Sequence, residues 1–316
     1  MPRRSDAINN EYGVCRWISQ HEALHHFATY VGATQSQQHI KPLHWYIACR
    51  LVLEGGFHPN DITPRPPFSV ALRPGKAPLL TFDASVATGG ERTILGGLKT
   101  KNVDVVVTKD GLGPVLAVSC KGMTGAFRNL TNRMEETIGE CTNLHITYPA
   151  MVFGYMFIIR ANRQIEEIAG TLPAEGAEPA RQLAANDVAV KVGGEHIESI
   201  ARFYAALREL TGRRGIRNDV SRYESVALAM VEPEGEASGE VFAAFPKSDS
   251  PLHLDRFSQT MYLRYEERFL LGAPDLKAVT RRHEWSPQSP ALDASKIDFA
   301  SYPTLAYEVR MADAGG

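Results

Sequence analysis

Residues 150–159 form an uninterrupted apolar run, Ala-Met-Val-Phe-Gly-Tyr-Met-Phe-Ile-Ile. A half-exposed strand alternates apolar and polar residues, whereas a run without alternation is typical of an interior strand that is covered on both faces. Such strands occur mainly where helices pack on each side of a sheet. The run therefore predicts an α/β fold built around a buried mixed sheet.

A hairpin is predicted upstream of this strand. Residues 103–108 and 115–120 are rich in β-branched residues, and Asp110-Gly111 between them supplies the turn chemistry of a hairpin. The spacing of apolar residues predicts a helix on each side of the hairpin, over 41–54 and 126–141. The predicted core is thus a helix, a mixed sheet with a hairpin, a second helix and a buried strand.

The remaining elements are predicted around this core. The predicted division is an N-terminal helical segment over 1–38, the core over 39–170, and an α/β C-terminal elaboration over 171–316, either separate from the core or part of the same domain. The elaboration is expected to contribute to oligomerisation or DNA recognition. The other predicted helices are 14–34, 197–210 and 254–271, and 171–178 is an exposed linker. The other predicted strands are 68–72, 79–82, 92–95, 187–192, 223–231 and 241–245, and the last two pair across an acidic loop.

Composition narrows the class of protein. The 316 residues carry a net charge of −2, and no stretch approaches the roughly 20 apolar residues of a membrane span. The N-terminus lacks the apolar centre of a signal peptide. The four cysteines form no Cys-x-x-Cys pair, which favours reduced thiols. We expect a cytoplasmic protein without a membrane partner.

Asp104, Lys121 and Glu135 form a candidate catalytic set. Asp104 interrupts a run of valines, where an ionised carboxylate is costly unless it binds a cation. Ser119 and Lys121 end the second hairpin strand and point to one face, because side chains alternate along a strand. On a helical wheel Glu135 lies at the edge of the apolar stripe formed by Leu130, Met134 and Ile138, so it is expected to face the sheet. Carboxylates that hold Mg²⁺, with a cation nearby, suit phosphodiester hydrolysis.

The local charge agrees with a phosphate ligand. Between Glu91 and Arg133 the chain has seven basic and three acidic residues, a net of +4 within a chain of −2. Such a patch is a place where phosphates can dock. The predicted phosphate contacts are Lys99, Lys101, Arg128 and Arg133.

Asp104 on one hairpin strand and Ser119-Cys120-Lys121 ending the next resemble the PD-(D/E)xK nuclease superfamily over roughly residues 40–160. Two positions depart from its pattern: Val103 precedes the aspartate, and Ser119 replaces the acidic residue. Certain tetrameric type II restriction endonucleases of that superfamily share the serine and take a glutamate from the following helix, fourteen residues beyond the lysine, which here is Glu135. The resemblance implies a restriction-endonuclease-like core, with Asp104 and Glu135 as Mg²⁺ ligands, Lys121 as a catalytic cation and Ser119 beside them.

The predicted function is therefore Mg²⁺-dependent cleavage of double-stranded DNA by a type II restriction enzyme or related phage-defence nuclease, acting as a homodimer or homotetramer. Glu54 and Glu91 are weaker candidates for a further metal ligand. Two alternatives stay open. His21, Glu22 and His25 form an HExxH pattern, as in zinc metallopeptidases, although no third ligand follows at the usual spacing. The other is a non-catalytic DNA-binding protein with a nuclease-like fold.

Overall fold

A five-stranded mixed sheet forms the centre of the computed structural model, which describes residues 12–164, 183–217 and 219–272 together with 276, 283–286, 289 and 310–311. The strands lie in the order β1 (Ile62–Thr63), β6 (Val105–Lys109), β7 (Gly113–Met123), β8 (Val152–Arg160) and β9 (Ser225–Val231). Pairing is antiparallel from β1 to β7 and parallel from β7 to β9. The predicted α/β class with a mixed sheet is confirmed.

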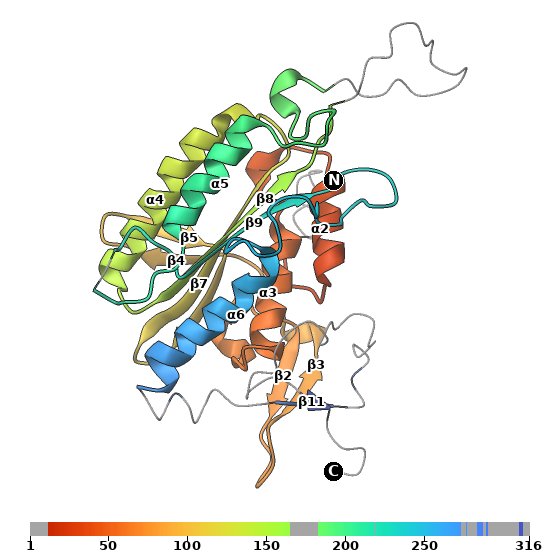
Figure 1. The fold of residues 1–316 in the computed structure, drawn as a ribbon. Coiled ribbons are helices and arrows are strands. Elements are labelled where there is room, and N and C mark those ends of the chain that lie inside the picture. The colour runs from red at the N-terminus through yellow and green to blue at the C-terminus, as the bar shows by residue number, and fades with distance from the viewer. Residues whose placement is uncertain are drawn as a thin grey trace, which may run out of the picture.

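Helices cover both faces of this sheet (Figure 1). On one face lie α4 (Leu130–Thr147) and α5 (Glu198–Leu210), and on the other α2 (Gln20–Thr29), α3 (Lys41–Leu53) and α6 (Leu254–Tyr265). Alternate residues of β8 enter the two cores, since Phe153, Tyr155 and Phe157 pack with α4 and α5. Val152, Met156 and Ile158 pack with α2, α3 and α6. The apolar run is therefore an interior strand, as its composition predicts.

Smaller sheets and single turns complete the described part of the chain. One four-stranded sheet has the order β11 (Arg310–Met311), β10 (Glu284–Trp285), β3 (Leu79–Phe82) and β2 (Phe68–Ala71), and β4 (Arg92–Leu95) pairs with β5 (Thr100–Val103) as a separate hairpin. Short 3₁₀ turns occupy Thr34–Ser36, Pro59–Asp61, Ala84–Val86, Phe127–Asn129 and Ala185–Asp187, and a π-helical turn follows α6 at Glu266–Leu270.

Several predicted boundaries are wrong. The helix expected over 14–34 is confined to Gln20–Thr29, because the Ser19 side chain and Glu22 close a capping box at its start. The helix expected over 126–141 runs instead from Leu130 to Thr147. Residues 187–192 form only isolated bridges through Val190, and 241–245 only one bridge, between Val231 and Val241. The predicted linker 171–178 lies outside the described residues.

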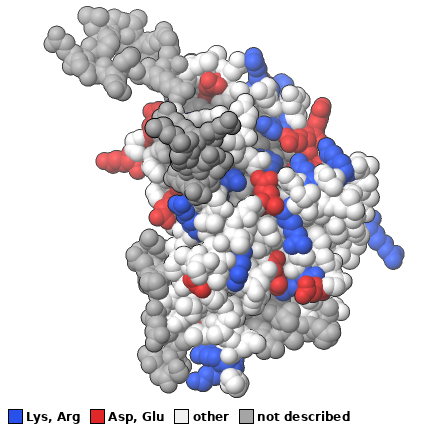
Figure 2. All heavy atoms as spheres, turned by 180° about the vertical axis from the view of Figure 1, so that it is seen from behind, with Lys and Arg blue, Asp and Glu red and all other residues white. Residues whose placement is uncertain are grey.

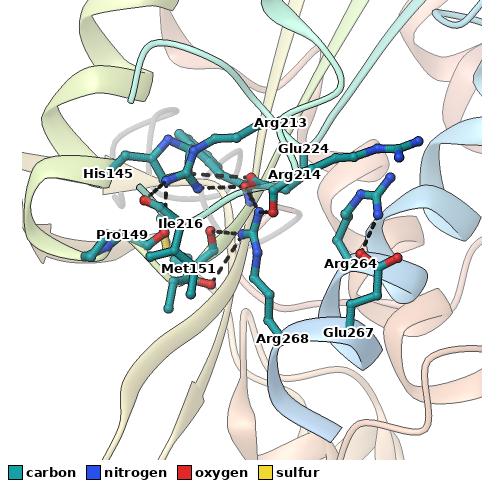
Figure 3. A network of polar contacts seen from close by, with 12 residues as sticks. His145, Pro149, Met151, Arg213, Arg214, Ile216, Glu224, Arg264, Glu267 and Arg268 are labelled. Carbon is teal, nitrogen blue, oxygen red and sulfur yellow. Dashed lines mark hydrogen bonds and ion pairs between the residues drawn. The ribbon is translucent and has the colours of Figure 1, made fainter. Parts of the chain in front are cut away.

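A buried ion network joins both helical layers to one end of the sheet (Figure 3). The Glu224 carboxylate, at the start of β9, lies 2.8 Å from Arg213 Nη1 and 2.6 Å from Arg268 Nη2, and it accepts a hydrogen bond from Phe153 N at 2.7 Å. His145 Nε2 of α4 lies 3.5 Å from the same carboxylate. Burial alone would raise the pKa of Glu224, but His145 and Arg268 outweigh it and hold the pKa below its ordinary value.

Breaking this network is expected to destabilise the fold. Glu224→Ala leaves two buried guanidinium groups without their carboxylate, which lowers the free energy of unfolding by about 3 kcal/mol. Urea denaturation measures this loss. Glu198→Ala is the matched control, because Glu198 pairs with Arg202 on the surface of α5, where both side chains are exposed, and exposed pairs contribute about 0–1 kcal/mol. Equal effects of the two substitutions would contradict the prediction.

Among the residues that the structure describes, no helix combines the length and the apolar character needed to cross a membrane.

Candidate active site

Asp104 lies at the junction of two sheets. The sequence predicts that Asp104 lies inside one continuous strand. In the structure β5 ends at Val103 and β6 begins at Val105, so Asp104 occupies a bend between them. Its side chain is 1 % exposed. Oδ2 accepts hydrogen bonds from Cys120 N at 2.7 Å and from Lys121 Nζ at 3.0 Å. The ionised carboxylate is therefore held by a backbone amide and a lysine of the neighbouring strand.

β7 carries Ser119 and Lys121 on the same face, as the strand period predicts. The strand continues to Met123, so Lys121 lies within it and not at its end. The Ser119 hydroxyl is fully buried, 3.4 Å from Asp104 Oδ2 and 3.3 Å from a carboxylate oxygen of Glu140. A single hydroxyl proton can serve only one of these oxygens at a time. Ser119 thus bridges two acidic side chains.

Glu140, which no sequence pattern indicates, is the second acid of the site. It projects from α4, is 4 % exposed, and its Oε2 lies 3.6 Å from Lys101 Nζ. Its other oxygen, Oε1, is buried and has no hydrogen-bond partner among the described residues. Because a buried acceptor without a partner costs about 1–3 kcal/mol, this oxygen needs an explanation.

The expectation that Glu135 faces the sheet is wrong, because its side chain is exposed. The buried stripe of α4 runs through Leu130, Thr137, Cys141 and Leu144, and Ile138 is 38 % exposed. Five residues span about 500° of helix, so Glu135 points about 140° away from Glu140. Glu140 falls within the predicted helix, but on the face of α4 that is buried against the sheet.

The pKa values of the two acids in the site are shifted in opposite directions. Burial alone would raise the pKa of Asp104, but the charges of Lys121 and His44 outweigh it and hold the pKa below its usual value. Burial raises the pKa of Glu140, and Lys121 and Lys101 only partly offset this. Burial would lower the pKa of Lys121, but Asp104 and Glu140 raise it far above the ordinary value. Lys121 therefore stays charged. A further cation near Glu140 would stabilise its ionised form.

Two more buried side chains border the site. His44 of α3 is 3 % exposed, and its Nε2 lies 3.9 Å from Asp104 Oδ1 without a hydrogen-bond partner among the described residues. Burial lowers the pKa of His44 to about 4, so its ring is neutral at physiological pH. The Tyr155 hydroxyl lies 2.9 Å from the Thr137 hydroxyl under the same face of the sheet. Neither residue was selected from the sequence, because no local motif marks it.

The two weaker acidic candidates lie in different surroundings. Glu54 is engaged by Arg50, whose Nε lies 2.5 Å away, and by the Tyr262 hydroxyl at 3.3 Å, so it joins α3 to α6. Glu91 is half-buried just before β4, and its pKa is raised by burial and by the charge of Asp104. Glu91 therefore feels the field of the site, whereas Glu54 belongs to helix packing.

The four predicted phosphate contacts are only partly brought together. Lys101 reaches Glu140, and the exposed Lys99 lies in the turn of the same β4–β5 hairpin. Arg133 is also exposed and pairs with Glu136 at 2.6 Å, and Arg128 is exposed in the 3₁₀ turn before α4. Basic and acidic side chains are intermixed on the face shown in Figure 2. A phosphate-binding surface on that face would therefore involve only a few neighbouring basic side chains.

The HExxH residues have structural partners. Glu22 caps its own helix, since its Oε2 accepts from Ser19 N and from Ser19 Oγ, both at 2.8 Å. His21 lies 3.2 Å from Glu240, and His25 lies 3.1 Å from the Ser238 carbonyl. All three side chains are exposed. The geometry therefore gives Glu22 a capping role and leaves this pattern with less support than the site at Asp104.

The site's oxygen donors fit a hard divalent cation. Among the described residues, no group of three or more His, Cys, Asp and Glu is arranged to hold a metal ion. Mg²⁺ does not require such a group, because it commonly binds through one or two carboxylates and takes waters and phosphate oxygens for the rest of its shell. Asp104 and the unpartnered Oε1 of Glu140 would supply that carboxylate pair.

The raised pKa of Glu140 predicts a pH-dependent stability of the metal-free protein. The folded state holds this proton more tightly than the unfolded chain, so the free energy of unfolding falls as pH rises from about 4.3 through the raised value. Glu140→Gln has no such loss. We expect the variant to be more stable than wild type by on the order of 1 kcal/mol near neutral pH, and not at about pH 4.

Urea denaturation in EDTA at both pH values measures this difference. Glu135→Gln provides the control, because this exposed side chain lies outside the site. A Glu140→Gln variant less stable than wild type at neutral pH would contradict the assignment of Glu140 as a strained, buried acid.

Comparisons with protein-family models, with curated proteins and with solved structures find no match for this chain.

Proposed function

We propose that this protein is a Mg²⁺-dependent endonuclease that hydrolyses phosphodiester bonds of double-stranded DNA, with the role of a type II restriction or related phage-defence enzyme. One observation carries the proposal. Two buried acids, Asp104 and Glu140, lie on either side of Ser119 and beside Lys121, and one oxygen of Glu140 has no hydrogen-bond partner among the described residues. Acids are buried with a free oxygen at a high cost unless a cation completes the site.

The topology supports the same proposal. The chain passes through α3, β1, β6, β7, α4 and β8 in that order, with β2 to β5 inserted between β1 and β6. Neighbouring strands are antiparallel from β1 to β7, and β8 is parallel to β7. This is the order of helix, hairpin, helix and buried strand that the PD-(D/E)xK resemblance implies. Asp104 precedes one hairpin strand, Lys121 lies on the next, and Glu140 replaces Glu135 as the acid from the helix.

Each side chain would contribute a separate step. Mg²⁺, when bound, would polarise the phosphate and lower the pKa of a bound water. Asp104 and Glu140 would hold the ion. The Lys121 ammonium would stabilise the charge that develops on the attacking water and the phosphate oxygens. The Ser119 hydroxyl, which lies near both carboxylates, would hold them in position. Cleavage of both strands calls for two such sites, so we also propose a homodimer or homotetramer.

Metal removal tests the proposed function. Supercoiled plasmid and phage DNA are incubated with the protein in Mg²⁺, in EDTA, and in EDTA followed by excess Mg²⁺. We expect nicked and linear products in Mg²⁺, intact DNA in EDTA and restored cleavage after readdition. Sequencing the ends reports whether cleavage is sequence-specific. Metal-independent DNA binding with intact plasmid under every condition would instead identify a non-catalytic binding protein.

A further inference from the structure

The β4–β5 hairpin lies beside the candidate site and packs against α4. Arg92 pairs with Val103 and Leu95 with Thr100, so the two strands form a separate two-stranded sheet. One face is anchored by Ile94 and Val103, which are 3 % and 0 % exposed. At the far end Leu95 and Leu98 are 64 % and 77 % exposed. Two large apolar side chains are therefore presented to solvent at the tip of a supported hairpin.

A buried asparagine of α4 fixes the turn of this hairpin. Asn143 is 1 % exposed, and its Oδ1 accepts from Leu98 N at 2.8 Å and from Lys99 N at 3.0 Å. Its Nδ2 donates to the Lys99 carbonyl at 2.9 Å, and Gly97 N donates to the Asn143 carbonyl at 2.8 Å. Both polar atoms of the side-chain amide are thus bonded to the turn. The hairpin tip is therefore held in one conformation before any ligand arrives.

Two glycines allow the turn to lie directly on α4. A Cβ added to Gly96 would meet Asn143 Nδ2 at 2.1 Å, and one added to Gly97 would meet Ile146 Cγ2 at 2.3 Å. Real side chains do not tolerate such distances, so any other residue would push the hairpin away from the helix. The close approach indicates that the position of the tip relative to α4 is specified by the sequence.

The hairpin also joins the site at two points. Asp104 directly follows β5, and Lys101 of β5 lies 3.6 Å from Glu140. Glu140 and Asn143 belong to successive turns of α4, so one helix positions both an acid of the site and the hairpin tip. Residues 92–103 include three basic residues, Arg92, Lys99 and Lys101, and no acidic residue. This charge fits a polyanion.

We propose that the β4–β5 hairpin is the element that reads double-stranded DNA, with Leu98 and Lys99 entering a groove and Asn143 as a positioning residue. This proposal rests on the proposed function. A two-stranded ribbon fits the major groove, where a leucine can contact thymine methyl groups and a lysine can contact guanine or a phosphate. The positive charge of the hairpin favours DNA over a second copy of this chain, whose net charge is only −2.

The test measures DNA affinity and not cleavage. Fluorescence anisotropy of a labelled duplex is recorded in Ca²⁺ over a series of salt concentrations, with the duplex checked for integrity afterwards. The variant L98A/K99Q is compared with L72A/K76Q, which removes an exposed leucine and an exposed lysine from the β2–β3 hairpin. We expect L98A/K99Q to bind at least about 10-fold more weakly, with a salt slope smaller by about 1, and the control to bind like wild type.

Asn143 is tested by a pair of substitutions. Asn143→Ala removes every side-chain contact with the turn and is expected to weaken DNA binding by about 10-fold. Asn143→Asp keeps the acceptor for the Leu98 and Lys99 amides but loses the donor to the Lys99 carbonyl, so it is expected to recover only part of that affinity. Thermal unfolding identifies a variant that loses binding by losing its fold. If Asn143→Asp were folded but bound no better than Asn143→Ala, the positioning role would be overturned.

The remaining outcomes separate this proposal from the proposed function. Wild type that cuts DNA, together with an L98A/K99Q variant that binds like wild type, overturns the role of the hairpin and leaves the nuclease assignment intact. Wild type that neither binds nor cuts DNA overturns the proposed function itself. A change of oligomeric state in L98A/K99Q on sedimentation, with unchanged DNA affinity, assigns the hairpin to a subunit contact and also overturns its role in DNA recognition.

Discussion

Replacing Lys121 with alanine is expected to lower the rate of Mg²⁺-dependent plasmid cleavage by about 10³-fold. The ammonium is the cation nearest to Asp104, 3.0 Å from its Oδ2, and it is 20 % exposed, so it can reach both the acid and a phosphate. Its raised pKa keeps it charged, and a fixed charge in a partly desolvated site stabilises a developing anion strongly. Single-turnover cleavage of supercoiled plasmid measures the loss.

Lys109→Ala is the matched control for this variant. Lys109 lies at the opposite end of β6 and forms its own ion pair with Asp61 at 2.7 Å. Both substitutions remove an ion-paired lysine from the β6–β7 hairpin, but only Lys121→Ala removes the cation beside Asp104. Circular dichroism establishes that each variant is folded. A folded Lys121→Ala protein that cuts at the wild-type rate would exclude Asp104 and Lys121 as the catalytic pair.

Glu140→Gln is expected to reduce cleavage by about 10²–10³-fold, because a neutral amide at this place gives up several kcal/mol of interaction with the bound cation. Glu135→Gln, five residues earlier on the same helix, is expected to cut within about twofold of wild type, since surface changes away from special features have small effects. The two substitutions are chemically identical. Their comparison therefore isolates the direction in which the side chain points.

Mn²⁺ binding in the absence of DNA supplies a second readout for this pair. Calorimetry or electron paramagnetic resonance should show weaker binding in Glu140→Gln and unchanged binding in Glu135→Gln. The opposite ranking, with Glu135→Gln inactive and Glu140→Gln active, would return the metal role to Glu135 and would show that α4 is rotated in the DNA-bound protein.

The strands of the site could be predicted from the sequence because their geometry is local. Side chains alternate strictly along a strand, so Ser119 and Lys121 had to share a face whichever residue began β7. The turn at Asp110-Gly111 set the hairpin that brings Asp104 opposite them. The three residues that carry these local signals are the three that the structure brings together.

The helix acid could not be predicted in the same way. The buried stripe of a helix is predicted from its apolar residues, which here include Met134 and Ile138. The residue that is buried against Tyr155 is instead Thr137, which is polar. An error of one residue turns a helix by about 100°, which is enough to exchange an inward acid for an outward one. His44 and Asn143 lacked any local signal, because each acts on a segment more than 40 residues away in the chain.

Asp104 is the single residue between a strand of the hairpin and a strand of the central sheet. Consecutive Cα atoms across a trans peptide are about 3.8 Å apart, so the chain has no slack at this point. A ligand that displaced the hairpin would pull directly on the Asp104 carboxylate, and on Glu140 of α4 through Lys101, whereas Ser119 and Lys121 would stay fixed in β7. Discrimination between substrates would then appear in the turnover rate more than in affinity, because the tether misaligns a reacting group without removing a contact.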